Sequence, residues 1–402
     1  MGSAGVFSGV RVIELAQYVF VPGASVLMAD QGAEVIKIET PGAGDPYRTL
    51  KVGDGREVGN TNLAMEQNNR GKKSVALDLK SEEGREALLK LVETADVFLT
   101  SLRPKAIKSL RLDVEDLRAR NPKIIYARGN GFGFKGEEAD KPGFDSSAFW
   151  ARGGMSHVFT IPGNQPTPPR PAFGDHSGSM SLAFAMASAL YKRAATGEPS
   201  VVETSLLSTA VWMLSSDVTY SQAPGYKVHG EGASRFPLMR GYPTKDGRMI
   251  QLMLLDPRPH WPTLCKLVDI EHLVNDPRFA DNEARMKNCD ELAAIIGEKI
   301  GAHDWAYWRP RFDAWDAPWE LLRTLFDVSE DPQVIANDMI FHMDFEGTKV
   351  RLVSGPAVFD GQAAPLEMRG SPGLGEHTEA LLSEAGYSDG AIAEMKSRKI
   401  VQ

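Results

Sequence analysis

Short apolar segments and helical segments alternate regularly over the first 130 residues, and this alternation constrains the fold more than any other feature. The apolar segments have the length of strands and comprise Val10–Leu15, Glu34–Glu39, Ser74–Leu79, Asp96–Leu102 and Lys123–Ala127. Helical patterns lie between them at Pro22–Gly32, Glu82–Thr94 and Val114–Arg120. Strands that alternate with helices at this spacing form βαβ units, in which the strands run parallel. The sequence therefore predicts an α/β domain on a parallel sheet, and it leaves the order of the strands open.

The length of 402 residues is too great for one small domain. Glycine and proline become frequent near residue 221, which indicates a crossing into a second domain. Residues 240–256 have the pattern of a hairpin with its turn at Asp246-Gly247, and 258–327 are helical, with five tryptophans that we expect to pack in a core. We expect a large domain at 1–221, a small domain at 222–335 and a third segment at 336–402.

Acidic residues outnumber basic residues, and the formal net charge is -8. This balance argues against general binding to nucleic acid or to anionic membranes. We find neither a run of 18 apolar residues nor the basic and apolar start of a signal peptide. Cys265 and Cys289 have no metal-ligand spacing, and free thiols are favoured over a disulfide. We expect a cytoplasmic protein with no nucleic-acid partner, no membrane partner and no metal site.

Asp175 stands in a glycine-flanked turn before Gly178–Ala195, a run of small residues with the pattern of a buried helix. The N–H groups at a helix N-terminus favour an anion. Asp175 therefore fits two roles, a helix cap, which is the commoner one, and a reactive carboxylate. A second carboxylate, Asp145, precedes the aromatic pair Phe149 and Trp150, and by itself it fits an ordinary turn.

Two basic clusters border the predicted strands. NRGKKS at 69–74 precedes a strand, and SLRPKAIK at 101–108 follows one. Ligands of open α/β sheets bind beyond the carboxyl ends of the strands, where the second cluster is expected. Phosphate binding and a solvated basic face both fit these clusters. The segment GFGFKG at 131–136 has the spacing of a dinucleotide fingerprint, but it leads into a charged loop and does not predict a nucleotide site.

The chain resembles the class III CoA-transferase family over nearly its whole length. The resemblance rests on segments that follow the family's order, namely GVRVIELAQ, ADQGAEVIKIETPGAGDPYR, NRGKKSVALDLKSEEG, ADVFLTSLRPKAIKSL, NPKIIYARGNGFG, PGFDSSAFWARGG, FGDHSGSMSLAFAMASAL and SPGLGEHTEALLSEAGYSDGAIAEM. It implies a Rossmann-like parallel-sheet large domain plus a smaller α+β domain in an interlinked homodimer. Residues 336–402, with strand-like pieces at Lys349–Val353 and Ala357–Phe359, would then return to the large domain.

The resemblance also implies transfer of CoA from an acyl-CoA to a free carboxylic acid through a covalent aspartyl-CoA thioester on Asp175. The helix N-terminus is expected to keep this carboxylate ionised. CoA thioesters are then substrates, and no permanently bound cofactor is expected. By position, the CoA contacts fall on Gln17, Tyr18, Val19, Arg70, Lys72, Lys73, Ser101, Leu102, Arg103 and Lys108. The expected substrate contacts are Phe144, Asp145, Trp150 and Gly174.

Aromatic residues at the expected substrate site favour a medium-sized, partly apolar acceptor, such as an aryl, branched or 2-hydroxy acid. Thr40 and Ser109 depart from the formyl-CoA branch of the family, which has arginines there, and 236–247 lack that branch's glycine run. The racemase branch is an alternative, but it uses a histidine where Phe144 stands, and phenylalanine cannot act as a base. A non-catalytic CoA-binding protein is the other alternative, and it would form no covalent intermediate.

Overall fold

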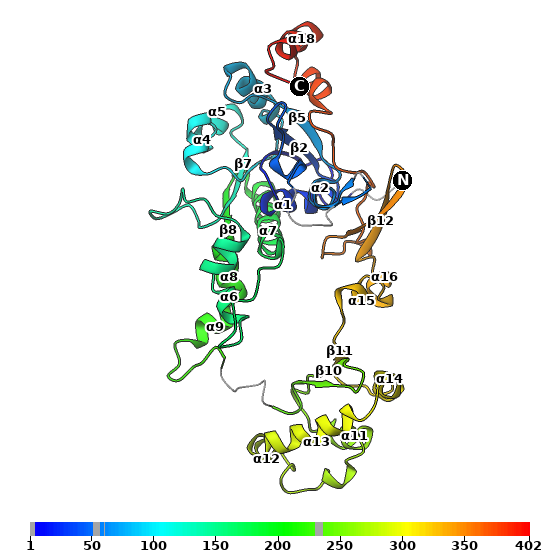
Figure 1. The fold of residues 1–402 in the computed structure, drawn as a ribbon. Coiled ribbons are helices and arrows are strands. Elements are labelled where there is room, and N and C mark those ends of the chain that lie inside the picture. Colours follow the sequence, from blue (N-terminus) through cyan, green and yellow to red (C-terminus); the bar gives the residue numbers. More distant parts are fainter. Residues whose placement is uncertain (1–4, 51–56, 60, 230–235) are drawn as a thin grey trace. The chain divides into compact units, whose positions relative to one another are not determined.

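The computed structural model describes residues 5–50, 57–59, 61–229 and 236–402 of the chain. The chain forms two compact units (Figure 1). One unit comprises Met1–Pro224 together with Pro332–Gln402, and the other comprises Gly225–Asp331. Each unit buries its own hydrophobic core.

The larger unit is built on a six-stranded sheet. Its strands are β1 (Arg11–Leu15), β2 (Glu34–Glu39), β5 (Lys73–Ala76), β6 (Val97–Thr100), β7 (Ile125–Asn130) and β8 (Val201–Ser205). They lie in the order β5-β2-β1-β6-β7-β8, and every neighbouring pair is parallel. The predicted parallel sheet is therefore confirmed. Winding starts at β1 and reverses direction between β1 and β6, which creates the switch point of a doubly wound sheet.

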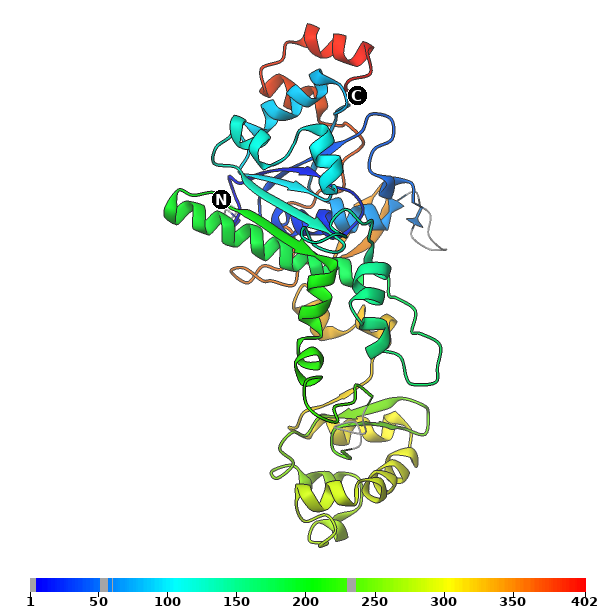
Figure 2. The ribbon, with the colours of Figure 1, turned by 90° about the vertical axis from the view of Figure 1, so that its left-hand side faces the viewer.

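Helices cover both faces of this sheet (Figure 2). One face packs against α3 (Glu82–Val92), α4 (Pro104–Leu110), α5 (Val114–Arg120), α17 (Thr378–Glu384) and α18 (Asp389–Ser397). The other face packs against α1 (Phe20–Ala29), α7 (Phe173–Thr196) and α8 (Leu206–Met213). Successive strand side chains alternate between the two cores, with Val12 in one and Ile13 in the other. This burial on both sides explains why the strands are continuous apolar runs in the sequence.

Helices α1 and α7 lie side by side in close contact (Figures 1 and 2). A Cβ atom on Gly23 would lie 2.5 Å from Oγ of Ser179, and one on Gly178 would lie 2.5 Å from the ring of Phe20. The hydroxyl of Ser179 also donates to the carbonyl oxygen of Phe20 at 2.6 Å. The two glycines therefore let the helix backbones approach, which fixes the start of α7 beside the turn that follows β1.

The C-terminal segment shares the core of the larger unit. Val401 forms an antiparallel bridge with Leu77, and the N–H of Gln402 donates to the carbonyl oxygen of Ala76 at 3.4 Å. The remaining elements of this unit are η1 (Pro46–Arg48), β3 (Glu57–Val58), β4 (Thr61–Asn62), α2 (Leu63–Asn69), the π-helix η2 (Asp145–Arg152), α6 (Met155–Val158), α9 (Ser215–Tyr220), α16 (Pro332–Ala336), β12 (Ile340–Phe345) and β13 (Thr348–Val353).

The smaller unit combines helices with a three-stranded antiparallel sheet of order β11-β10-β9. Its elements are β9 (Gly241–Pro243), β10 (Met249–Leu252), α11 (Trp261–Leu267), η3 (Glu271–Leu273), α12 (Asn282–Lys287), α13 (Cys289–Gly301), α14 (Trp305–Asp313), β11 (Trp319–Leu321) and α15 (Leu325–Val328). The predicted hairpin is confirmed, since β9 and β10 pair antiparallel. Trp261, Trp308 and Trp315 are buried in the core of this unit, as expected.

Two segments differ from the prediction, one near the C-terminus and one at the edge of the large sheet. Residues 357–359 form only an isolated bridge between Phe359 and Gln362, not a strand. Strand β8 was not predicted, because it lies at the edge of the sheet and alternates exposed with partly buried side chains. An edge strand of this kind lacks the apolar run that identifies the central strands.

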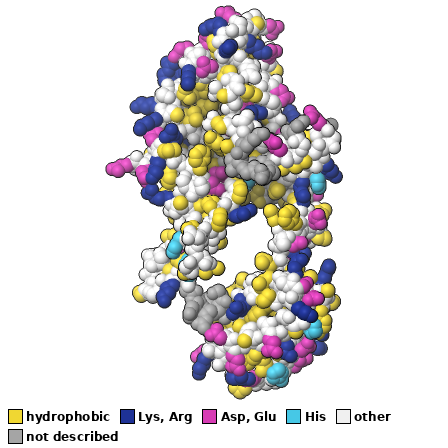
Figure 3. All heavy atoms as spheres, viewed as in Figure 1, with side chains coloured by type: hydrophobic (Ala, Val, Ile, Leu, Met, Phe, Trp, Pro, Cys, Tyr) yellow, Lys and Arg dark blue, Asp and Glu magenta, His cyan; other side chains and the backbone are white. Residues whose placement is uncertain are grey.

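Acidic and basic side chains are intermingled on the face of the molecule in Figure 3, without a large expanse of one sign. In the described part of the chain, no helix is long and apolar enough to cross a lipid bilayer. The described residues also contain no group of three or more His, Cys, Asp and Glu side chains that could hold a metal ion.

Candidate active site

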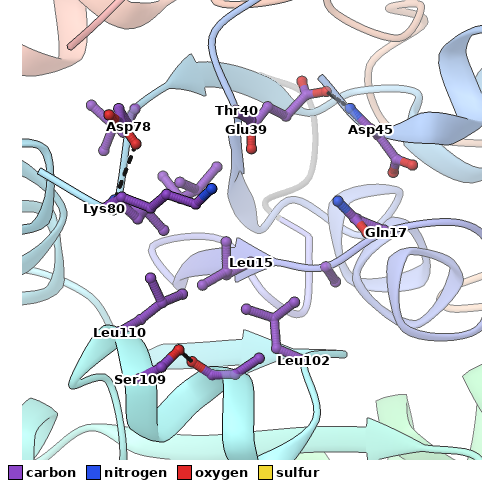
Figure 4. A pocket seen from close by; sticks show the side chains of 15 residues that line it. Leu15, Gln17, Glu39, Thr40, Asp45, Asp78, Lys80, Leu102, Ser109 and Leu110 are labelled. Carbon is purple, nitrogen blue, oxygen red and sulfur yellow. Dashed lines mark hydrogen bonds between the residues drawn. The ribbon is translucent and has the colours of Figure 1, made fainter. Parts of the chain in front are cut away.

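A pocket of about 340 Å³ opens at the carboxyl edge of the parallel sheet (Figure 4). It lies at the ends of the neighbouring strands β1 and β6, where the chain continues to α1 on one face of the sheet and to α4 on the other. Ligands of doubly wound sheets bind at this switch point. The pocket is lined by Leu15, Ala16, Gln17, Ile38, Glu39, Thr40, Asp45, Leu77, Asp78, Leu79, Lys80, Leu102, Ala106, Ser109 and Leu110. Apolar side chains dominate this lining, and polar groups stand among them, so the pocket suits a ligand with apolar and polar parts.

Two residues expected to contact CoA, Gln17 and Leu102, line this pocket. They follow β1 and β6, on the two sides of the switch point. Thr40 and Ser109, where arginines stand in the formyl-CoA branch, line the same pocket. The departures from that branch therefore lie where a bound ligand would meet them.

Three other residues of the segment after β6 that were expected to contact CoA do not line the pocket, namely Ser101, Arg103 and Lys108. The hydroxyl oxygen of Ser101 accepts a hydrogen bond from the N–H of Gln17 at 3.1 Å, so Ser101 holds the turn after β1. The guanidinium of Arg103 donates to the carbonyl oxygen of Asp140 at 2.9 Å, and Lys108 is exposed on α4. Arg103 and Lys108 therefore border the region of the pocket without lining it.

Arg70 and Lys72, two of the residues expected to contact CoA, hold their charged groups inside the protein. The guanidinium of Arg70 is buried and pairs with Asp30 at 2.6 Å. The ammonium of Lys72 is fully buried and pairs with Glu14 at 2.7 Å. A charge that is already paired inside the protein cannot also neutralise a phosphate in solvent.

Lys73 also lies away from the pocket at the switch point. It begins β5, so it stands at the amino edge of the sheet, and its ammonium pairs with Glu34. Sequence reasoning missed Lys80, which is exposed and follows β5 at the carboxyl edge. Figure 4 shows the Lys80 side chain extending toward the middle of the pocket. The rule that ligands bind beyond the carboxyl ends of strands favours Lys80 over Lys72 and Lys73, which lie at the amino end of β5.

Tyr18 connects the turn after β1 to the expected substrate residues. Its φ of 67° lies in the left-handed region, which is rare for a residue with a side chain. Its ring meets the ring of Phe144 edge to face at 5.3 Å and that of Tyr47 at 6.3 Å. Val19 is buried in a small cluster with Tyr47, so its side chain packs inside the protein. Ala172, just before α7, packs against the same cluster.

Asp175 lies in the first turn of α7, because this helix begins at Phe173, five residues earlier than predicted. The N-cap position is occupied by Ala172, whose φ of 57° is also left-handed. Asp175 therefore does not cap the helix, which removes the commoner of the two roles that the sequence left open. Strained backbone of this kind is concentrated at functional sites.

Asp145 is the carboxylate that meets the start of α7. Its Oδ1 accepts a hydrogen bond from the N–H of Gly174 at 3.2 Å, and its side chain is buried. A Cβ atom on Gly174 would lie 2.3 Å from this oxygen and 2.3 Å from Cγ of Phe149. Only glycine fits at this contact, so Gly174 joins the two carboxylates by letting their segments approach.

The two carboxyl groups have raised pKa values. Burial, and after it the negative charge of Asp145, raises the pKa of Asp175 to about 7. Burial raises the pKa of Asp145 to about 6, although the N–H groups of Gly174 and Phe173 oppose this change. The structure thus differs from the expectation that the helix N-terminus keeps Asp175 ionised. Near neutral pH, Asp175 is present in both its protonated and its ionised form.

Aromatic side chains surround this carboxyl pair. Phe173 packs against Phe149 at 6.1 Å and against Trp150 at 5.8 Å between ring centroids. Phe144 and Phe173 are exposed, whereas Trp150 is buried and its indole N–H has no hydrogen-bond partner. Phe144 stands where the racemase branch has a histidine. Because the phenylalanine ring carries no group that can exchange a proton, it cannot replace that histidine as an acid or base.

Comparison with known proteins agrees with this arrangement. The sequence model of CoA-transferase family III matches residues 7–378. The cinnamoyl-CoA:phenyllactate CoA-transferase of Clostridium sporogenes is 35% identical, over 99% of this chain and 97% of that protein. The (R)-2-hydroxy-4-methylpentanoate CoA-transferase of Clostridioides difficile is 32% identical, over 98% of this chain and 99% of that protein.

A solved crystal structure is similar in fold to this chain. The crystal structure of the D175A mutant of Rv3272 from Mycobacterium tuberculosis superimposes with a TM-score of 0.81 at 28% identity. The match covers 94% of this chain and 99% of that one. The family model, the relatives and this structure each extend over nearly the whole chain. The chain belongs to CoA-transferase family III.

Proposed function

We propose that this protein transfers CoA from an acyl-CoA thioester to a free carboxylic acid, with Asp175 as the covalent carrier. The observation that carries the proposal is the position of Asp175, a partly buried carboxyl in the first turn of α7 that does not cap the helix. It lies beside Asp145, and Phe144, the neighbour of Asp145, packs on Tyr18 in the turn that leads from the pocket. A CoA whose nucleotide end occupies the pocket would extend along this turn toward Asp175.

The chemistry splits one transfer into steps that each break one bond and form one bond. The ionised carboxylate of Asp175 attacks the carbonyl carbon of the donor thioester, the C–S bond breaks, and CoA leaves as a thiolate. This thiolate attacks the aspartyl carbonyl of the resulting anhydride, and the donor acid leaves as a carboxylate. The same two steps in reverse, with the acceptor carboxylate, regenerate Asp175 and release the new acyl-CoA.

We assign the acceptor to the class of 2-hydroxy acids with an aryl or branched aliphatic side chain. Support comes from Phe144 and Phe173, whose exposed side chains offer apolar surface beside the carboxyl pair, with the buried Trp150 packed against Phe173. Support also comes from the two relatives, whose names specify phenyllactate and (R)-2-hydroxy-4-methylpentanoate. Both of these acids combine a 2-hydroxyl group with an apolar side chain.

We further propose that two copies of the chain form a homodimer, as the family resemblance implies. Large apolar side chains on α7 and α8 support this, since Phe184, Tyr191 and Trp212 are each at least 75% exposed in the single chain. Exposed apolar side chains of this size mark interaction surfaces. Light scattering during size-exclusion chromatography tests the proposal, and the mass of a single 43.9 kDa chain at micromolar concentration would overturn it.

The transfer itself is tested with a panel of donors and acceptors analysed by mass spectrometry of the acyl-CoA products. Cinnamoyl-CoA and acetyl-CoA serve as donors, and phenyllactate, 2-hydroxy-4-methylpentanoate, 3-phenylpropionate, glutarate and oxalate serve as acceptors. The proposal predicts new acyl-CoA from the 2-hydroxy acids and none in the Asp175→Ala variant. Products from oxalate or glutarate alone would refute the acceptor class, and no product from any pair would refute the transferase.

A further inference from the structure

Four charged side chains form a fully buried cluster beneath the turn that follows β1. The members of this buried charge cluster are Glu14, Lys37, Asp45 and Lys72. Each is at most 1% exposed, and the two positive charges balance the two negative ones. The ammonium of Lys37 lies 2.9 Å from both Glu14 and Asp45. Removing such charges from water is costly, so a neutral, fully paired cluster calls for a reason beyond stability.

The cluster makes hydrogen bonds to the main chain of the turn itself. The ammonium of Lys37 donates to the carbonyl oxygen of Ala16 at 2.9 Å. Oδ1 of Asp45 accepts from the N–H of Tyr18 at 3.2 Å and from the N–H of Tyr47 at 2.9 Å. The residues on both sides of Gln17 are therefore held by one buried ion pair.

Lys72 and Glu14, the other two members of the cluster, hold the start of α1. The ammonium of Lys72 donates to the carbonyl oxygen of Pro22 at 2.9 Å and to Oδ1 of Asn69 at 3.1 Å. The hydroxyl of Ser25 donates to Glu14 as well as to the carbonyl oxygen of Pro22. The turn is thus fixed at its beginning by Lys37 and Asp45, and at its end by Lys72.

The conformation held in this way is one that a tyrosine does not adopt freely. Tyr18 has a φ of 67°, and a left-handed residue with a side chain persists only where the surroundings determine it. The same residue places its ring on Phe144, next to Asp145. The turn therefore connects the pocket, through Gln17, with the carboxyl pair, through Tyr18.

We propose that Lys37 and Asp45 are positioning residues, which hold the turn of Ala16 to Tyr18 in the strained conformation that binds the CoA thioester. This inference rests on the proposed function and adds to it a buried support for the binding turn. Lys37 is closed off from solvent, and Asp45, at the wall of the pocket, is only 1% exposed and directs its Oδ1 to the N–H groups of Tyr18 and Tyr47. Their effect is transmitted through the carbonyl of Ala16 and the N–H of Tyr18.

Asp45→Asn is the main variant, because asparagine keeps the shape and an acceptor oxygen but loses the charge that pairs with Lys37. Lys37→Met is a second variant that removes the donor to Ala16. Lys73→Met is the matched control, since Lys73 also lies on a strand of the sheet but pairs with Glu34 at the opposite edge. Hydrogen exchange of the peptide over 15–23, and CoA affinity by calorimetry, are measured for all three.

We expect faster exchange of the 15–23 peptide in Asp45→Asn and in Lys37→Met, with CoA binding weaker by about tenfold. The control stays within twofold of the wild type, and the exchange of a peptide from α7 stays unchanged. A purely structural role would instead speed exchange throughout the larger unit. If Lys37→Met does not fold, Asp45→Asn alone decides the outcome.

Unchanged exchange at 15–23, or CoA affinity within twofold of the wild type in Asp45→Asn, would overturn the inference. These two readouts need no turnover, so they separate this inference from the proposed function. Loss of transferase activity in every donor and acceptor pair, with the exchange and affinity changes present, would refute the function and leave the positioning role in place.

Discussion

The N–H of Gly174 donates to the carboxylate of Asp145 at 3.2 Å, so the start of α7 is held by a carboxylate from a distant segment of the chain. This contact brings Asp145 near Asp175, one residue beyond Gly174. It also leaves the side chain of Asp175 free of the capping role that its place in the sequence favours. One hydrogen bond therefore both positions the proposed nucleophile and places a second negative charge beside it.

Gly174→Ala should abolish most of the transferase activity. The added Cβ would lie 2.3 Å from Oδ1 of Asp145 and 2.3 Å from Cγ of Phe149, so the two segments must separate. We expect a loss of about 1–3 kcal/mol in the free energy of unfolding. A shift of the carboxyl pair by about 1 Å would lower kcat about a hundredfold. Gly390→Ala is the control, because a Cβ there meets nothing within 4 Å. Wild-type kinetics in Gly174→Ala would contradict the packing described.

The rate of transfer should rise with pH through about 7, because attack needs the ionised form of Asp175 and burial raises its pKa to about 7. Below that pH, kcat/KM should fall about tenfold per pH unit. In Asp145→Asn the neighbouring negative charge is gone, so the pKa of Asp175 falls and the acidic limb moves to lower pH. A pH-rate profile of both proteins tests this, and an unshifted limb would show that Asp145 does not influence the nucleophile.

Asp175→Asn should stabilise the protein, and more at pH 8 than at pH 5. The pKa of about 7 in the folded protein exceeds the ordinary aspartate pKa of 3.8, so the folded state binds the proton more tightly. The free-energy cost of ionising Asp175 is absent below about 3.8 and complete above about 7. At pH 8 the variant should melt a few degrees above the wild type. At pH 5 this difference in melting temperature should be smaller. Asp316→Asn, at an exposed position, should show no such trend.

Lys80→Ala should raise the KM for acyl-CoA about three- to tenfold, because the exposed ammonium extends into the pocket and can neutralise a phosphate (Figure 4). The loss should shrink as salt is added, since salt screens this attraction. Lys73→Ala should leave KM within twofold, since Lys73 pairs with Glu34 at the other edge of the sheet. Equal effects of the two variants would contradict the assignment of this pocket to CoA.

The central strands could be predicted from sequence because burial on both faces makes them continuous apolar runs. Strand β8 could not, because its edge position leaves alternate side chains exposed. The order of the strands is set by pairing between distant segments, such as β1 with both β2 and β6, which local spacing does not encode. The first turn of α7 was also missed. The helix begins after Ala172, which has a left-handed backbone and no side chain that caps the helix, so the sequence contains no signal for this start.

Among the basic residues, sequence alone could not separate buried lysines from exposed ones. Lys72 and Lys80 stand at opposite ends of the same predicted strand, and both fit a phosphate site by residue type. The structure distinguishes them, since Lys72 pairs with Glu14 inside the protein and Lys80 is exposed at the pocket. Asp175 could be chosen as a candidate from the sequence, whereas the position of Asp145 near it depends on a hydrogen bond between Asp145 and Gly174, 29 residues apart in the chain.

The covalent CoA carrier that we propose, Asp175, can be observed directly. The measurement is incubation with an acyl-CoA donor and no acceptor, followed by peptide mass spectrometry with and without hydroxylamine. We expect a CoA adduct on the peptide that contains Asp175, which is cleaved by hydroxylamine and absent from Asp175→Ala. A protein that transfers CoA between acids while no such adduct forms, or an adduct that persists in Asp175→Ala, would contradict this expectation.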